Sequence, residues 1–353
     1  MSKLRKKSRT RSSSTAGVSS RCGVSWDIIG HKKLLALLEK HVVNGPFHAY
    51  LFVGEMHLGK KTVARQFIKA LQCQDKFKKP CAKCPSCFQA EAGTHPDIII
   101  VEKEAPKATI QKDVEKGGEI KVDRIRGIKR VLSLKPHSSS YKICFIPEAD
   151  KMNKEAANAL LKILEEPLGN VIFILVAPHT RTLLPTIVSR TQIVKFFSVS
   201  RDVLLKALKE KTSVKKAEEI VALSGGKPGR ALQILENPEI IDFYKNALKN
   251  ILRIKNDDLT ARFRKAEEMS KNLVEAEKIL NIWLSFYRDL ILYKSGNPTY
   301  LLNPNFQDEL SRYAEKYSLE EIKEIIRSIV GTKELFIRNV NPRLSLESLF
   351  LKI

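Results

Sequence analysis

The sequence has no apolar run of the roughly 18 residues that a membrane-spanning helix needs, so we expect no association with a membrane. The basic amino-terminal segment is followed by no apolar core, and a secretory signal is therefore not expected either. No internal repeat is evident. Acidic residues are scarce, because 39 Asp and Glu face 62 Lys and Arg, and the formal net charge is +23. This excess favours an anionic partner, with nucleic acid first, over the alternative of a well-solvated basic surface.

Cysteine is sparse, with six residues in the chain, yet four of them fall between positions 73 and 87. Without a secretory signal, this clustering indicates a reducing compartment, the cytoplasm, where neighbouring thiols bind metal and do not pair as disulfides. Two overlapping Cys-x-x-Cys turns, at Cys81, Cys84 and Cys87, follow Cys73 after seven residues, and the four thiolates form the ligand set expected of a tetrahedral Zn²⁺. This set leaves no position for water, so we expect a structural zinc site; unligated thiols in a loop are the alternative.

The length of 353 residues suggests two or three domains. Residues 1–22 are rich in Ser, Lys and Arg and nearly free of large apolar side chains, so we expect a disordered basic tail. Residues 23–198 alternate short apolar runs with helical patterns, which predicts an α/β domain with the zinc module inserted at 73–87. Residues 199–235 predict a small helical domain, and residues 236–353 show helical periodicity throughout, which indicates a separate all-helical domain.

Five short apolar runs in the α/β domain predict buried strands, at 48–53, 97–101, 142–146, 171–176 and 191–196. Amphipathic stretches between these runs predict helices, at 60–72, 121–134 and 152–165. Continuous apolar strands separated by helices favour a parallel sheet that is covered on both faces. In the all-helical domain the clearest helical patterns are at 270–294 and 319–336.

A loop with two glycines follows the first predicted strand. The run Gly-Glu-Met-His-Leu-Gly-Lys-Lys-Thr at 54–62 lies between a strand and a helix, in the order that a phosphate-binding P-loop requires. Its glycines allow backbone N–H groups to surround phosphates, and its first lysine would reach the terminal phosphates. The loop therefore predicts a nucleotide site that includes Gly54, Gly59, Lys60 and Thr62.

Two positions of this site depart from an active nucleotide hydrolase. Lys61 stands where a Ser or Thr hydroxyl should bind Mg²⁺, and Thr62 comes one residue late, a rotation of about 100° on a helix. Pro147 stands where the first of two adjacent acids is needed after the strand 142–146, so that only Glu148 remains. We therefore expect no Mg²⁺ site and no intrinsic ATP hydrolysis. Binding of ATP itself stays open, because Lys60 is present.

These features together resemble the amino-terminal AAA+ module, a P-loop fold, of bacterial clamp-loader subunits of DNA polymerase III. The resemblance covers roughly residues 26–235; the unit at 199–235 would be the family's helical lid, and the remainder matches its collar domain in pattern only. The most specific matches are Glu148-Ala-Asp-Lys-Met152 and the run AANALLKILEEP at 156–167. Further matches are Ile29-Gly-His31, the strand and phosphate loop that begin at residue 48, Cys73 at the end of the next helix, and the segment 120–126. A Ser-Arg motif at 184–190 also matches, although Thr191 replaces the cysteine that follows it in the family.

The resemblance implies roles for two arginines. In the family the arginine of the Ser-Arg motif projects into a neighbour's ATP site, so Arg190 would be a trans-acting arginine finger. A surface arginine in a turn is the alternative. Arg230 matches the second sensor, which touches the nucleotide in active members. The polar residue of the first sensor is missing, since Ala177 and Pro178 follow the strand.

Motor subunits of the family keep the phosphate-loop Thr and the paired acids, whereas delta-prime subunits lose them and keep the finger. By this resemblance the chain is identified as a member of the delta-prime type. It would be a stator in a hetero-pentamer with gamma/tau and delta subunits, which opens the sliding clamp and sets it on primed DNA. Two alternatives remain: an active gamma/tau-type ATPase, which would hydrolyse ATP with Mg²⁺, and a free zinc-containing DNA-binding protein, which would bind DNA without partners.

Overall fold

A computed structural model of the protein describes residues 23–24, 26–103, 118–166, 169–254, 257–297, 301–302, 306–338 and 340–353. The predicted basic tail at 1–22, and Pro167 of the AANALLKILEEP motif, lie outside these residues. The chain divides into two compact units, one mainly of residues 33–52 and 61–194 and the other of residues 28–32, 53–60 and 195–353. Within the described ranges, no helix is both long and apolar enough to cross a bilayer.

A five-stranded sheet in the order β4-β5-β6-β2-β7 forms the centre of the α/β region. Its strands are β2 (Ala49–Val53), β4 (Ile98–Ile100), β5 (Lys142–Ile146), β6 (Val171–Ala177) and β7 (Gln192–Lys195). β5 pairs in parallel with both β4 and β6. Every residue of β2, β5 and β6 is buried, as in a sheet that is covered on both faces. The five predicted strands and the parallel pairing are confirmed.

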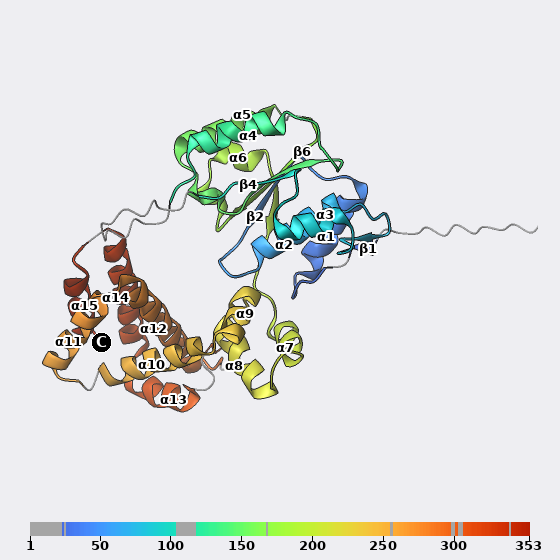
Figure 1. Cartoon of the computed structure of the whole chain (residues 1–353). Helices are drawn as coiled ribbons and strands as arrows, with labels where there is room; N and C mark the ends of the chain where they lie inside the picture. Colours follow the sequence, from blue (N-terminus) through green and yellow to red (C-terminus); the bar gives the residue numbers. More distant parts are fainter. Residues whose placement is uncertain are drawn as a thin grey trace, which may run out of the picture. The chain divides into compact units, whose positions relative to one another are not determined.

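Helices cover the two faces of this sheet, with α4 and α5 on one and α1 and α2 on the other (Figure 1). Their bounds are α1 (Lys32–Asn44), α2 (Lys60–Gln72), α4 (Val122–Leu132) and α5 (Lys154–Glu165). Two short helices, α3 (Pro85–Ala92) and α6 (Pro185–Ser189), carry predicted functional residues. β1 (Gly23–Val24) and β3 (Lys78–Lys79) form a separate parallel pair that the sequence did not predict. The three predicted helices are confirmed, because apolar residues at helical spacing are buried, as Ile125, Ile128 and Leu132 are in α4.

The rest of the described chain is helical. Three helices surround a small core that includes Leu204, Leu208 and Ile220: α7 (Arg201–Lys209), α8 (Val214–Ser224) and α9 (Pro228–Glu236). Six more share a larger core around Trp283: α10 (Glu239–Ile254), α11 (Leu259–Ser270), α12 (Leu273–Lys294), α13 (Gln307–Lys316), α14 (Leu319–Ile337) and α15 (Pro342–Phe350). The predicted all-helical region is confirmed, whereas the predicted domain limits at 198 and 235 stay predictions.

Candidate functional site

The phosphate loop takes a conformation that depends on its glycines. Gly54 has a φ of +151°, and a Cβ there would lie 2.7 Å from the backbone oxygen of Phe196, so no larger residue fits. Gly59, with a φ of +85°, leads directly into α2. The Lys60 side chain is buried, and its ammonium donates hydrogen bonds to the loop's own carbonyl oxygens, at Gly54 and, over 2.6 Å, at Glu55. Lys60, which was predicted to reach phosphates, therefore binds the backbone of its own loop in this structure.

The next residue, Lys61, binds Glu148, the one acid that remains of the two adjacent acids expected after β5. Its Nζ lies 2.9 Å from Oε1 of Glu148, and Nζ of Lys103 lies 3.4 Å from Oε2 of the same carboxylate. The hydrogen bond from Lys61, followed by the positive charges of both lysines, lowers the pKa of Glu148. Pro147 is buried, and the side chain of Thr62 is exposed. Both oxygens of the carboxylate thus face an ammonium group, and a lysine and a proline stand where the hydroxyl and the other acid are needed to hold Mg²⁺.

The start of α9 packs against the phosphate loop. The N–H of Gly229 donates to the carbonyl oxygen of His57 over 2.8 Å, and Nζ of Lys227 lies 2.6 Å from Oε2 of Glu55. Burial lowers the pKa of His57, and the positive charges of Arg230, Lys227 and Lys60 lower it further. The predicted sensor residue Arg230 is therefore close enough to the loop for its charge to lower the pKa of His57. Positive charge gathers around this loop, which suits an anion.

The predicted finger, Arg190, lies at the carboxy-terminal end of α6 and is held at both ends of its guanidinium. Nη1 donates to the backbone oxygen of Thr186 over 3.1 Å, and Nη2 lies 2.9 Å from Oε1 of Glu165, the last residue of α5. The side chain of Arg190 remains 39% exposed, which leaves it accessible to a second molecule. Sequence reasoning missed Glu165, because the two residues are far apart in the chain and no local pattern links them.

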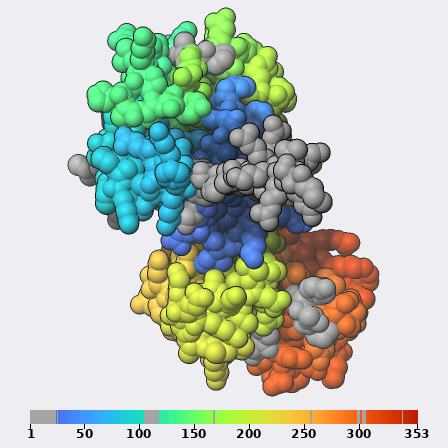
Figure 2. All heavy atoms as spheres, turned by 90° about the vertical axis from the view of Figure 1, so that its right-hand side faces the viewer, coloured from blue at the N-terminus to red at the C-terminus, as the bar shows by residue number. Residues whose placement is uncertain are grey.

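The four predicted metal ligands come together in one cluster. Their Sγ atoms all lie within 4.8 Å of one another, and the sulfurs of Cys81 and Cys87 are 4.0 Å apart. In a ZnS₄ tetrahedron with bonds of about 2.3 Å, neighbouring sulfurs lie roughly 3.8 Å apart. The spacing of the cysteines therefore fits a tetrahedral metal ion. Figure 2 shows this part of the chain, in cyan, at the molecular surface.

Backbone N–H groups around the cluster support thiolate ligands. Ala82 has a φ of +54°, and the turn it forms brings the N–H groups of Lys83 and Cys84 to 3.5 and 3.3 Å from Sγ of Cys81. The N–H of Lys83 contributes most to lowering the pKa of Cys81, to about 7. Burial raises the pKa of Cys73 and Cys87. Four sulfurs with such donors could hold a soft divalent metal.

A buried network next to the cluster was not predicted. Ser86, between two of the cysteines, donates to the backbone oxygen of Gln72 over 2.7 Å and lies 2.8 Å from Nε2 of His95. Nδ1 of His95 accepts the N–H of Asp97 over 3.1 Å, so this nitrogen carries no proton and Nε2–H donates to Ser86. The Asp97 carboxylate accepts the N–H groups of His137 and Ser138. These bonds tie the cysteine module to α2 and to the sheet edge.

Comparison with known proteins gives the family. Residues 30–200 match the family described as "DNA polymerase III, delta subunit", and residues 245–353 match "DNA polymerase III, delta subunit, C terminal". The two matches lie in the α/β region and in the carboxy-terminal helices respectively, and together they span most of the chain.

Individual relatives carry related names. The chain is 26% identical to DNA polymerase III subunit delta' of Bacillus subtilis over 87% of this chain and 90% of that protein. It is 34% identical to subunit delta' of Pseudomonas aeruginosa over 51% of this chain, spanning about half (53%) of that protein's length.

The chain is also 24% identical to subunit tau of Bacillus subtilis, over 93% of this chain and 61% of that protein. A solved gamma-subunit-related protein of Thermotoga maritima is similar at 18% identity and a TM-score of 0.45, over 90% of this chain and 97% of that one. The sequence-based resemblance is thus confirmed, and the chain belongs to the clamp-loader family of bacterial DNA polymerase III subunits.

Proposed function

We propose that the chain is the delta-prime subunit, or stator, of the clamp loader of bacterial DNA polymerase III. It would act in the cytoplasm, in a hetero-pentamer with gamma/tau and delta subunits that loads the sliding clamp on primed DNA. The names of the relatives support the assignment as a delta-prime subunit, and the net charge of +23 supports contact with DNA. The single observation that carries the stator role is the ion pair between Lys61 and Glu148.

The ion pair argues that this subunit does not hydrolyse ATP. Phosphoryl transfer needs a divalent cation beside the β- and γ-phosphates, held by a hydroxyl and an acid. Here an ammonium stands at the hydroxyl position and binds the acid that remains, while proline removes the other acid. A Mg²⁺ ion would meet like charge in place of ligands. The chain would then keep a degenerate nucleotide site that supports no hydrolysis, formed by Gly54, Gly59, Lys60, Thr62 and Arg230.

Arg190 supplies the function that the subunit would keep. Its guanidinium is held at one surface of the α/β region but is still 39% exposed, as a group offered to a neighbouring subunit must be. In a neighbour's ATP site it would stabilise the negative charge that develops on the transferred phosphoryl group. The chain would assist hydrolysis elsewhere in the ring without a hydrolytic centre of its own.

The cysteine cluster would hold a structural Zn²⁺, since four thiolates leave no ligand position for water. The predicted limits of the α/β domain at 23–198, the lid at 199–235 and the collar at 236–353 belong to the same proposal. The collar helices would bind the other subunits of the pentamer.

The experiment is a reconstituted loader in which DNA-stimulated ATP hydrolysis is measured with wild-type, R190A and R181A forms of this chain. Arg181 is an exposed arginine of the same region and serves as the matched control. We expect R190A to lower the rate at least tenfold and R181A to leave it unchanged, because removal of an arginine finger costs about 10³–10⁵-fold in other phosphoryl-transfer systems. An undiminished rate with R190A would remove the finger role.

The similarity to subunit tau over 93% of the chain gives one competing function, an active motor subunit. That function requires Mg²⁺-dependent ATP turnover by the isolated chain, and the stator requires none. A turnover assay on the purified chain separates the two.

A further inference from the structure

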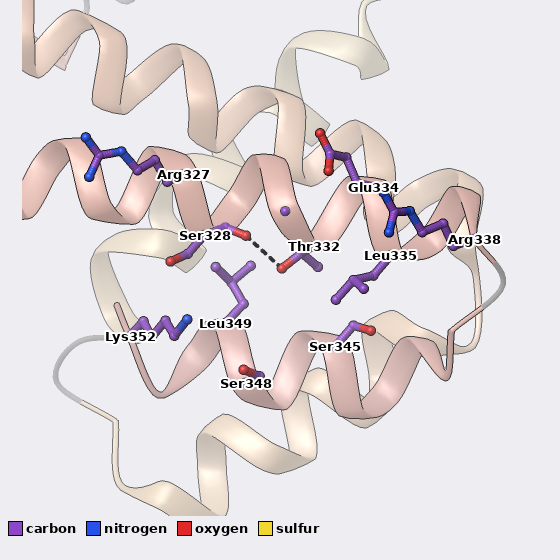
Figure 3. Close-up of a pocket in the computed structure, with 11 residues that line it drawn as sticks. Arg327, Ser328, Thr332, Glu334, Leu335, Arg338, Ser345, Ser348, Leu349 and Lys352 are labelled. Atoms are coloured by element: carbon purple, nitrogen blue, oxygen red, sulfur yellow. Dashed lines mark hydrogen bonds between the residues drawn. The ribbon is translucent and has the colours of Figure 1, made fainter.

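A groove of about 390 Å³ lies between α14 and α15 (Figure 3). Its volume falls within the range of about 300–1,000 Å³ that is typical of ligand sites. Small residues, most with hydroxyl groups, leave the space between the two helices unfilled. They are Ser328, Gly331 and Thr332 on α14 and Ser345 and Ser348 on α15. None of these residues has a role in the nucleotide loop, the arginine finger or the cysteine cluster.

Gly331 leaves the middle of the groove open. It lies inside α14, where glycine costs about 1 kcal/mol relative to alanine. No atom of the described chain outside its own helix lies within 4 Å of where a Cβ would be, as is also true of Gly127 in α4. The glycine therefore leaves open space in the middle of the groove, and the identity of an occupant must come from the residues that line it.

Charged and apolar residues are arranged along the groove in a definite order. Arg338 caps the carboxy-terminal end of α14, eleven residues after Arg327 and about 16 Å from it along the helix axis. Arg327 and Lys352 lie toward one end of the groove and Arg338 toward the other (Figure 3). Leu335 and Leu349 line the groove as well. Among the described residues, none of the three cations has an ion-pair partner within 4.0 Å.

We propose that this groove binds an extended, acidic segment of a partner protein, about five residues long, with carboxylates at both ends and uncharged side chains between them. Five extended residues span about 16 Å, the separation of the two arginines. The carboxylates would meet Arg338 at one end and Arg327 with Lys352 at the other, where no competing ion pair must be broken. The uncharged centre would lie over Gly331, beside Leu335 and the hydroxyl group of Ser348.

A single-stranded nucleic acid fits the groove less well. Its phosphates follow one another at every nucleotide, so a negative charge would also lie over the middle of the groove, between the cations at its two ends. None of the described residues that line the groove is aromatic, and sequence-tolerant binding of single strands relies on stacking of bases on aromatic side chains. Strongly exposed apolar residues on the same helices, Ile337 and Leu344, also suit a protein partner more than a phosphate backbone.

The test uses the full chain and fluorescent peptides in an anisotropy titration. The probe has two aspartates at each end and a leucine–alanine centre. A second peptide of the same composition carries its aspartates in the middle, a third has lysines in place of aspartates, and labelled oligothymidylate represents nucleic acid. We expect the first peptide to bind at least about tenfold more tightly than the second and third, because its charges alone match the ends of the groove.

Two substitutions at one position provide the matched pair of variants. Gly331→Leu fills the groove with a good helix former, and we expect it to weaken binding of the first peptide about tenfold or more. Gly331→Ala places only a methyl group in open space and should retain binding within about twofold. Circular dichroism melting of both variants checks the fold. Arg338→Glu should weaken binding in the same way as the leucine variant.

Three results would overturn the proposal. They are failure of the first peptide to bind, binding of that peptide that Gly331→Leu leaves unchanged, and equal binding of the peptide with central aspartates. If oligothymidylate binds in competition with the peptide and is lost in Gly331→Leu, the groove is a nucleic-acid site and the peptide assignment is wrong. Because no arm of the experiment involves ATP or the other loader subunits, its outcome is independent of the stator role.

Discussion

Lys61 and Glu148 are separated by 87 positions in the sequence, yet Nζ of the lysine lies 2.9 Å from Oε1 of the glutamate. Lys61 stands where an active ATPase of this family would offer a hydroxyl to Mg²⁺, and Glu148 is the acid that remains next to Pro147. The replacement of the hydroxyl by an ammonium therefore also occupies the surviving carboxylate. Since Pro147 also removes the neighbouring acid, no single substitution restores both ligand types.

This relationship predicts how the site responds to repair. Lys61→Thr alone should leave nucleotide binding independent of Mg²⁺, because Pro147 still supplies no ligand and Lys103 still faces Glu148. Lys61→Thr combined with Pro147→Asp restores both ligand types, and we expect Mg²⁺ to tighten the binding of a fluorescent ATP analogue only in this double variant. Mg²⁺-dependent binding by the unmodified chain would contradict the interpretation of the site.

Removal of the metal should destabilise the cysteine module. We expect the purified chain to contain one zinc per molecule and expect chelation to lower its melting temperature, since four-cysteine sites contribute directly to folding. Cys87→Ser should abolish zinc retention, as measured by elemental analysis. Cys144→Ala is the control, because Cys144 is buried within β5 and lies outside the four-sulfur group. Equal zinc content in both variants would show that the cluster is not the metal site.

The sequence predicted the elements well because their signals are local. The run at 142–146 is apolar after Lys142 and forms β5 with the predicted bounds, and the helix at 60–72 begins and ends where its amphipathic pattern does. The four cysteines were predicted for the same reason, since their spacing alone gives the ligand set.

The contacts that define the site are not local. Glu165 beside Arg190, His95 beside Ser86, and Gly229 against His57 each join residues from different elements. Nothing in the neighbouring sequence of either partner selects the other, because the pairing is set by the packing of whole helices on the sheet. The strand pair β1 and β3 was missed because two residues carry no periodic pattern.

The buried histidine next to the cysteine module predicts a dependence of stability on pH. Burial lowers the pKa of His95 below its usual 6.5, and protonation would break the bond that Nδ1 accepts from Asp97. The unfolded chain therefore binds a proton at His95 more readily than the folded chain. The free energy of unfolding should fall as pH decreases below about 6.5, by up to about 1.4 kcal/mol per pH unit, and level off below the folded pKa.

Urea unfolding of the wild type and His95→Gln at pH 7.5 and 5.5 measures this contribution. His31, His41 and His57 also have lowered pKa values and titrate in both proteins, so they cancel in the comparison. We expect a smaller loss of stability on acidification in the variant. An identical loss in both proteins would exclude His95 as a source of the pH dependence.

The ion pair between Glu165 and Arg190 predicts that the glutamate acts through the arginine. If it holds the guanidinium in position, Glu165→Ala should lower DNA-stimulated ATP hydrolysis of the reconstituted loader about twofold to fivefold, since exposed pairs are worth about 0.2–1 kcal/mol. In the R190A background the same substitution should have no further effect. Additive losses would assign Glu165 an independent role, and a rise in rate would make it a restraint on the finger.

Two helical glycines predict opposite responses to the same substitution. In α9, a Cβ at Gly229 would lie 2.9 Å from the backbone oxygen of His57, so Gly229→Ala must displace the helix from the phosphate loop or distort that loop. We expect a loss of about 1–3 kcal/mol in the free energy of unfolding, as is typical of overpacking. In α4, Gly127 has no atom within 4 Å of its would-be Cβ, and Gly127→Ala should stabilise the chain by about 0.5–1 kcal/mol. Urea unfolding of the two variants measures both effects. If Gly229→Ala also stabilised the chain, the close packing of α9 on the phosphate loop would be wrong, and with it the placement of Arg230 beside that loop.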